Sequence, residues 1–311
     1  MKISVTGGSG FIGSHVVSLL RKMGHQVVVI DDFSSGLRQY ISNLSDVEII
    51  DANLQDLKLL KDATKDTDVI IHLAASGNVI ESVQSPMMNF QANVVNTLNV
   101  LEACRVNSIK RLIFSSTGGA LMGNAPLPVD ETSVPDPISP YGASKLACEN
   151  YIKVYSKCYG IEYAIFRFGN VIGPNCYHKK GVINKFFTAC TSSGKIDIFE
   201  DPSRDFVSVM DLANAITVAV DNEECKNEIF HLASGNEILI RFIADLFKIR
   251  FNLDSSRIKV SGERVGEVKR NYSNINKACQ KLGWNPDTNI ERLVNDTINW
   301  LENFEDKRKN K

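Results

Sequence analysis

Tyr141 and Lys145 have the residue types and the spacing of a proton-transfer pair. They lie four positions apart, directly after Pro140, which favours the first turn of a helix, so both side chains are expected on one helix face. A free tyrosine has a pKa of ~10, and a nearby ammonium group lowers that pKa by favouring the phenolate. Tyr141 is therefore a candidate general base that removes a hydroxyl proton as the adjacent carbon loses hydride. An ordinary tyrosine beside a surface lysine is the alternative, because this spacing also arises by chance.

Thr117 is the second candidate catalytic hydroxyl. It ends the apolar run "IKRLIFSST" (109–117), which predicts a buried strand. A hydroxyl at that strand end could relay a proton from the reacting oxygen or donate a hydrogen bond to it. A threonine that only satisfies nearby backbone groups is the alternative. The next residues, Gly118 and Gly119, have no side chain for acid–base chemistry.

A glycine-rich turn could hold the hydride acceptor that this chemistry needs. Gly7, Gly10 and Gly13 in "VTGGSGFIGS" lie between a predicted strand and a helical pattern. Without a Cβ, these residues let the pyrophosphate of a dinucleotide approach the backbone N–H groups at the helix start. Asp31 ends the next strand about 20 residues later, where a carboxylate binds the ribose hydroxyls. That carboxylate would repel the 2′-phosphate of NADP, so the sequence predicts NAD, and nearby Arg38 is expected to be solvated.

Short β-rich runs alternate with helical patterns, which predicts an α/β fold with a doubly wound parallel sheet of the Rossmann type. The predicted strands are 2–7, 26–31, 47–52, 68–75, 109–117 and 162–169, and the main helical patterns are 12–23, 88–107 and 141–159. After Asn170 a loop, further helices (182–193, 211–220, 288–304) and short strands predict a smaller α/β substrate-binding domain. We expect an NAD-binding domain over 1–169 with a returning segment near 205–232, and a substrate domain over 170–204 and 233–311.

The composition narrows the class of protein. The formal net charge of −1 gives no support for nucleic-acid or anionic-membrane binding. No apolar run approaches the ~18–20 residues of a membrane span, and the amino-terminal "MKISVTGG" enters a strand without room for a signal peptide. The 7 cysteines form no CxxC pair and no metal-ligand cluster with the 5 histidines, which fits reduced thiols. We therefore expect a cytoplasmic protein without a metal site.

Segments in order along nearly the whole chain resemble the extended short-chain dehydrogenase/reductase family, and within it the NAD-dependent epimerase/dehydratases that include UDP-galactose 4-epimerases. Beside the GxxGxxG turn, they are "DDFSSG" (31–36), "HLAA" (72–75), "SSTGGALMG" (115–123), "PDPISPYGASK" (135–145), "RFGNVIGP" (167–174), "SRDFVSVMDLANAI" (203–216) and "GERVGEVKRNYSNINKACQKLGW" (262–284).

The resemblance implies a catalytic set and a cofactor site. Tyr141, Lys145 and Thr117 would be catalytic, and Lys145 would also bind the nicotinamide ribose. The implied NAD-binding residues are Gly7, Gly10, Phe11, Ile12, Asp31, Asp32, Phe33, Ser34, Ser35, Asn53, Leu54, Leu73, Ala74, Ala75, Asn93, Ser115, Tyr141, Lys145 and Phe168. Asn53 stands where the family often has aspartate, and its amide can still accept from the adenine amino group.

The resemblance also implies a nucleotide-sugar site. Arg204 and Arg264 would bind the diphosphate, since guanidinium groups recognise phosphate with two parallel hydrogen bonds. The other implied substrate contacts are Thr117, Asn170 on a phosphate oxygen, Glu267 on the nucleoside ribose, and Asn271. Asn271 matches the position whose size gates 4-epimerase substrates, and its modest bulk leaves room for an N-acetyl group.

The implied activity is that of an NAD-dependent nucleotide-sugar 4-epimerase acting through a transient 4-keto sugar. UDP-glucose and UDP-galactose, or their N-acetyl analogues, would be substrates, and helices 88–107 and 141–159 would form a homodimer interface. A 4-ketoreductase or dehydrogenase with the same residues is the alternative. A 4,6-dehydratase is disfavoured because Gly118 and Gly119 replace its Asp-Glu pair, and a non-catalytic NAD-binding regulator would lack the tyrosine. Met122 and Gly77, where relatives carry tyrosine and lysine, leave the sugar open.

Overall fold

The computed structural model describes residues 1–192, 194–262 and 265–309. Its centre is a seven-stranded sheet with the order β3-β2-β1-β4-β5-β6-β11, in which every neighbouring pair is parallel. The strands are β1 (Lys2–Thr6), β2 (Gln26–Asp31), β3 (Val47–Asp51), β4 (Val69–His72), β5 (Arg111–Thr117), β6 (Glu162–Phe168) and β11 (Glu228–Leu232). The order reverses between β1 and β4, and such a reversal opens a crevice at the carboxyl ends of the strands. The predicted Rossmann-type α/β fold is confirmed.

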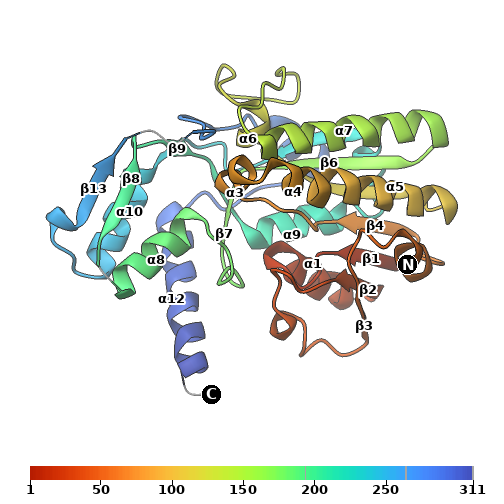
Figure 1. The fold of residues 1–311 in the computed structure, drawn as a ribbon, viewed down its shortest axis with the longest axis horizontal. Helices are drawn as coiled ribbons and strands as arrows, with labels where there is room; N and C mark the ends of the chain where they lie inside the picture. Colours follow the sequence, from red (N-terminus) through yellow and green to blue (C-terminus); the bar gives the residue numbers. More distant parts are fainter. Residues whose placement is uncertain (193, 263–264, 310–311) are drawn as a thin grey trace.

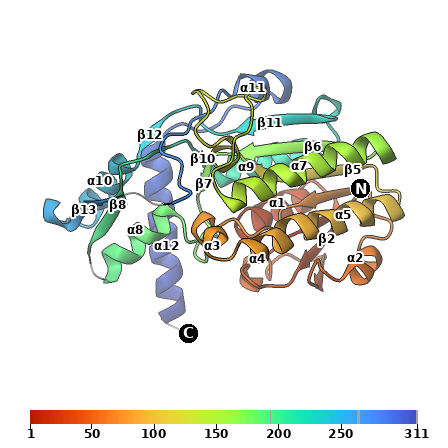
Figure 2. The ribbon, with the colours of Figure 1, turned by 45° about the horizontal axis from the view of Figure 1, so that its top comes forward.

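Helices cover both faces of this sheet (Figures 1 and 2). On one face, α1 (Phe11–Lys22) packs against α9 (Val209–Val218). On the other lie α2 (Leu57–Ala63), α5 (Asn96–Val106) and α7 (Pro140–Tyr159). Alternate strand residues feed the two apolar layers, so that Val27 and Val29 join one and Val28 and Ile30 the other. Burial on both faces explains why these strands are continuous apolar runs.

The predicted helix 88–107 is interrupted. It consists of α4 (Pro86–Phe90), a π-helical turn over Gln91–Val95, and α5. The π turn contains the buried Asn93, whose carbonyl accepts hydrogen bonds from the Thr97 hydroxyl at 2.7 Å and the Cys148 thiol at 3.5 Å. Side chains therefore bind a backbone group that a regular α-helix would engage, and such π turns recur at functional sites.

Most of the remaining elements form a second layer beside the carboxyl ends of the sheet, whereas α11 (Asn276–Leu282) packs against the edge strand β11. Where the sequence predicts only a loop after Asn170, a short strand, β7 (Asn170–Ile172), pairs with β10 (Phe206–Ser208). The other small pairs are β8 (Ile196–Phe199) with β13 (Ile258–Ser261) and β9 (Ser203–Arg204) with β12 (Ile238–Leu239), and the helices are α3 (Val79–Gln84), α6 (Gly119–Met122), α8 (Val182–Ser192), α10 (Ile240–Arg250) and α12 (Ile290–Lys309). A separate apolar cluster joins α8, α10 and α12, and we keep the predicted domain division as a proposal. Within the described ranges, no helix has the length and apolarity that crossing a bilayer requires.

Candidate active site

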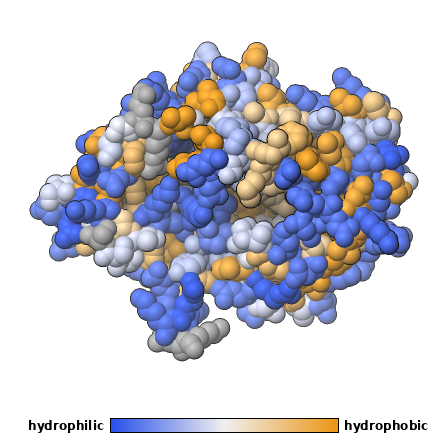
Figure 3. All heavy atoms as spheres, viewed as in Figure 1, coloured by the Kyte–Doolittle hydropathy of each residue, from blue (hydrophilic) through white to orange (hydrophobic). Residues whose placement is uncertain are grey.

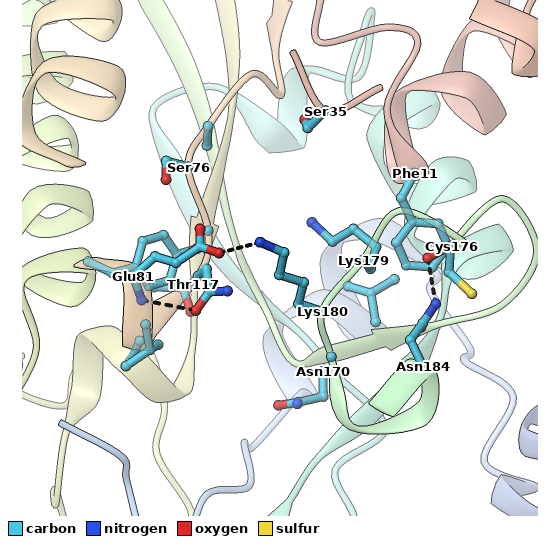
Figure 4. A pocket seen from close by; sticks show the side chains of 18 of the residues that line it. Phe11, Ser35, Ser76, Glu81, Thr117, Asn170, Cys176, Lys179, Lys180 and Asn184 are labelled. Carbon is cyan, nitrogen blue, oxygen red and sulfur yellow. Dashed lines mark hydrogen bonds and ion pairs between the residues drawn. The ribbon is translucent and has the colours of Figure 1, made fainter. Parts of the chain in front are cut away.

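A cavity of about 1250 Å³ lies between the carboxyl ends of the strands and the second layer. Figure 4 shows side chains from both parts of the chain pointing into it. The predicted site residues that line it are Gly7, Gly10, Phe11, Ile12, Asp31, Asp32, Ser34, Ser35, Asn53, Leu54, Leu73, Ala74, Ala75, Thr117, Tyr141, Phe168, Asn170, Arg204, Glu267 and Asn271. The cavity thus brings together the predicted cofactor, catalytic and substrate residues. Arg264, predicted to bind the diphosphate, lies outside the described residues.

The glycine turn at one end of the cavity is shaped for an anion. Gly7 has a φ of 70°, and the amide of Gly10 donates to its carbonyl at 3.1 Å. A Cβ on Gly13 would lie 2.1 Å from that carbonyl oxygen, so only glycine allows α1 to pack this closely. Gly10 is the N-cap of α1 and supplies no side-chain cap, which leaves N–H groups of the first turn for a ligand. These features fit the pyrophosphate of NAD.

Two carboxylates lie at the same end of the cavity, that of Asp31 at the end of β2 and that of Asp32 directly after it. The buried Asp31 accepts the backbone N–H groups of Ser9 and Phe33, each at 2.9 Å, which fixes its carboxylate at the cavity wall. Arg38 is drawn away by a 3.0 Å ion pair with Asp51, and its guanidinium lies 3.9 Å from the centre of the Phe33 ring. The structure does not bring Phe33 into the cavity, because its φ of 54° turns the chain and Arg38 covers its ring.

Tyr141 reaches the cavity from the first turn of α7. Ser139 caps this helix by accepting the Gly142 amide at 3.2 Å, as the predicted helix start requires. Burial raises the pKa of Tyr141 to about 12, while the neighbouring Thr117 hydroxyl acts in the opposite direction. The structure therefore places the two predicted catalytic hydroxyls in the same cavity, one from α7 and one from the end of β5.

Lys145 lies behind the cavity wall, one helical turn after Tyr141, and is 2% exposed. Its Nζ donates to the carbonyl of Ser115 at 2.8 Å and lies 4.6 Å from the centre of the Phe114 ring. Burial lowers the pKa of Lys145 to about 8. A lysine with this pKa is mostly protonated at neutral pH, so the site keeps a cation on the face of α7 that carries Tyr141.

Asn93 and Ser115 do not line the cavity, although both were predicted to touch the cofactor. The Asn93 amide accepts from the Ser76 N–H at 2.9 Å and donates to the Ser144 hydroxyl at 2.9 Å. Ser144 in turn donates to the Tyr141 carbonyl at 2.8 Å. Asn93 therefore ties the loop after β4 to the start of α7. The Ser115 hydroxyl is bound to the His72 carbonyl at 3.1 Å.

A buried ion pair beneath the predicted catalytic residues was missed from the sequence. Arg167 donates to both carboxylate oxygens of Glu149, at 3.1 and 2.8 Å, and the Ser116 hydroxyl adds a third hydrogen bond at 2.6 Å. The Glu149 and Arg167 side chains are 0% and 3% exposed. The pair joins α7 to β5 and β6. A glutamate four positions after Lys145 and an arginine within an apolar strand were the available signals.

The substrate half of the cavity contains a second ion pair. Arg204 donates to Glu267 at 2.9 Å and to the Ser203 carbonyl at 2.8 Å, and burial lowers the pKa of Arg204. Asn271 is 2% exposed, and its Nδ2 has no hydrogen-bond partner among the described residues. A buried amide donor at the cavity wall is available to a ligand.

Several charged lining residues were also missed, among them Glu81, Lys179 and Lys180. Lys179 and Lys180 lie in the loop between β7 and α8, and Glu81 lies on α3. The Nζ of Lys180 makes a 2.6 Å ion pair with Glu81 across the cavity (Figure 4). A double lysine in a polar loop gives no sequence signal for a site, since such residues are usually solvated.

Comparisons with known proteins agree with this fold and site. The model of the NAD dependent epimerase/dehydratase family matches residues 3–233. A Methanocaldococcus jannaschii protein with the provisional name UDP-glucose 4-epimerase is 38% identical, over 97% of this chain and 98% of that protein. Thermotoga maritima UDP-glucose 4-epimerase with UDP-glucose superposes with a TM-score of 0.91 at 32% identity, covering 98% of this chain and 100% of that chain. Methanobrevibacter ruminantium UDP-N-acetylglucosamine 4-epimerase in complex with UDP-N-acetylmuramic acid gives 0.89 and 32%, covering 97% and 98%.

The fold and the dinucleotide site define an enzyme of the short-chain dehydrogenase/reductase type, as the resemblance implied. The chain belongs to the NAD-dependent epimerase/dehydratase family. Its cofactor is NAD, and the uncapped first turn of α1 and the carboxylate of Asp31 fit that cofactor.

Proposed function

We propose that the protein is a nucleotide-sugar 4-epimerase that interconverts UDP-glucose and UDP-galactose, or their N-acetyl analogues, through a transient 4-keto sugar. The observation that carries the proposal is the placement of the Tyr141 and Thr117 hydroxyls in one cavity of about 1250 Å³ that also holds the dinucleotide turn. Similar proteins are named as UDP-glucose 4-epimerases, which supports a UDP-sugar as the substrate.

Tyr141 removes the proton from the C4 hydroxyl, and Thr117 donates a hydrogen bond to the reacting oxygen. When bound, NAD supplies a nicotinamide ring that accepts hydride and returns it. Lys145 holds a positive charge behind Tyr141, which favours the phenolate against the effect of burial. The 4-keto sugar must turn over within the cavity before its second face is reduced. When substrate binds, Arg204 would bind the diphosphate and Glu267 would bind the ribose, which weakens the ion pair between them.

The glycines after Thr117 support epimerisation over dehydration. A Cβ on Gly118 would lie 3.2 Å from the Phe168 carbonyl oxygen, and one on Gly119 would lie 3.0 Å from the Cγ of Asn271. The site therefore lacks the acids of a 4,6-dehydratase, and side chains at these two positions would need their neighbours to shift. A 4-ketoreductase with the same residues stays the second candidate, because the Tyr141–Thr117 pair serves either reaction.

We also propose a homodimer formed through the outer faces of α4, α5 and α7. Apolar side chains gather on this side of the molecule (Figure 3). The exposed ones are Met87, Met88, Phe90, Val106, Tyr151, Val154 and Tyr159. An apolar face of this kind on a soluble protein favours association with a second copy.

The experiment incubates the purified protein with UDP-, dTDP-, GDP- and CDP-sugars without added cofactor and follows the products by NMR. Interconversion of a pair of C4 epimers, with no net change in reduced cofactor, is the expected result. If a sugar changes only after NADH or NADPH is added, and that cofactor is consumed, the protein is a ketoreductase.

A further inference from the structure

Lys179 differs from the other charged residues named above at the cavity wall. Lys180 is paired with Glu81, and Arg204 is paired with Glu267. In the described part of the chain, no ion pair or hydrogen bond engages the ammonium group of Lys179. Its side chain lines the same cavity as the glycine turn. A cation at the wall of this cavity is available to an anionic ligand.

The loop that carries Lys179 is bound to the helix that begins at the glycine turn. The Nδ2 of Asn175 donates to the Ser14 hydroxyl at 3.0 Å, and His15 is hydrogen-bonded through Nε2 to the Pro174 carbonyl at 3.0 Å. Ser14 and His15 belong to α1. These two bonds hold the start of the loop, at Pro174 and Asn175, against α1.

The charges on the two sides of this part of the cavity have the same sign. The first turn of α1 has no side-chain cap, and a helix N-terminus carries a partial positive charge. In Figure 4, Lys179 lies between the side chains of Phe11, the first residue of α1, and Lys180. Lys179 is exposed and lines the cavity, so its ammonium group is accessible to an anion that enters. A ligand with two adjacent phosphates would interact more favourably with these two positive groups than a neutral ligand would.

We propose that Lys179 binds the diphosphate group of a ligand in the cavity, on the side opposite the first turn of α1. The diphosphate could be that of NAD or that of the nucleotide sugar. For the nucleotide sugar, the inference rests on the proposed function. The role is one of binding, and no proton transfer is assigned to Lys179.

The test compares Lys179→Ala and Lys179→Arg with Lys110→Ala, an exposed lysine just before β5, at the end of the sheet away from the cavity. One arm measures the NAD retained by each purified protein and the affinity for NAD after its removal. The other arm titrates the NAD-loaded protein with UDP, UDP-glucose and uridine by calorimetry. Loss of a charge-assisted hydrogen bond should weaken binding about tenfold or more. Uridine, which has no phosphate, should bind equally to all variants, and Lys179→Arg should restore the affinity.

A loss confined to NAD assigns Lys179 to the dinucleotide, and a loss confined to UDP and UDP-glucose assigns it to the nucleotide sugar. If Lys179→Ala binds every ligand within about twofold of Lys110→Ala, with an unchanged melting temperature, the inference is wrong. Epimerisation is measured separately. Weakened NAD or UDP binding in a protein that epimerises no sugar would refute the proposed function alone, whereas normal binding in an active epimerase would refute this inference alone.

Discussion

A Cβ at Gly119 would lie 3.0 Å from the Cγ of Asn271, so the buried Asn271 side chain packs directly against the glycine backbone. Asn271 has little freedom to move away, because it is 2% exposed. We expect Gly119→Ala to displace the Asn271 amide into the substrate half of the cavity. Turnover of the N-acetylated UDP-sugar should fall more than that of UDP-glucose. The ratio of the two kcat/KM values is the measurement, and an unchanged ratio would show that Asn271 does not limit the sugar pocket.

Tyr141→Phe should strongly slow epimerisation while leaving NAD bound. Loss of a general base lowers the rate by about 10²–10⁴-fold. The ring of phenylalanine preserves the packing, so the NAD content and the melting temperature should match those of the unmodified protein. Thr117→Val should have a smaller effect in the same assay. A Tyr141→Phe protein with near-normal turnover would remove Tyr141 from the mechanism.

Lys145 should make stability depend on pH with a definite sign. Its pKa is lowered from 10.5 to about 8, so the folded state holds this proton less tightly than the unfolded state does. The resulting destabilisation is fully present below pH 8 and disappears as the pH rises toward 10.5. We expect Lys145→Met to be more stable than the unmodified protein at pH 7, by up to about 3 kcal/mol, and inactive. Urea unfolding at pH 7 and pH 10 should show this difference shrinking at the higher pH, and a constant difference would contradict it.

Glu149→Gln should strongly destabilise the fold, because it leaves the buried Arg167 guanidinium without its counter-charge. Removing one partner of a buried pair costs about 3–5 kcal/mol. The matched control is Glu81→Gln, which breaks the exposed pair with Lys180 and should change the free energy of unfolding by about 1 kcal/mol or less. The double variant Glu149→Met/Arg167→Met should recover much of the loss. Equal effects of the two Glu→Gln changes in urea unfolding would contradict the assignment.

The sheet and the cluster of site residues were predictable because both depend on short-range patterns. The turn around Gly7 and Gly10 and the spacing of Tyr141 and Lys145 are set within one strand–helix unit. The resemblance then placed Arg204 and Asn271, which are far away in the sequence. Both line the same cavity as the glycine turn.

What could not be predicted depends on tertiary placement. Asn93 and Phe33 fall at positions that motif reasoning assigns to the cofactor, yet packing turns one toward Ser76 and the other toward Arg38. The ion pair between Glu81 and Lys180 joins residues 99 positions apart, and no local pattern reports such a pairing. The depth of Lys145, which sets the direction of its pKa shift, likewise follows from the strand beneath it.

The position of β11 has a consequence for how the chain is made. This strand is the outer neighbour of β6, but the chain reaches it only after building β7, α8, β8 and α9. On a ribosome, the edge of β6 therefore stays open until Leu232 has emerged. A product that ends before Glu228 would expose the backbone of β6 to other chains, and an open parallel edge of that kind promotes aggregation. The nucleotide-binding sheet therefore cannot be expressed intact as an amino-terminal fragment that ends at β6.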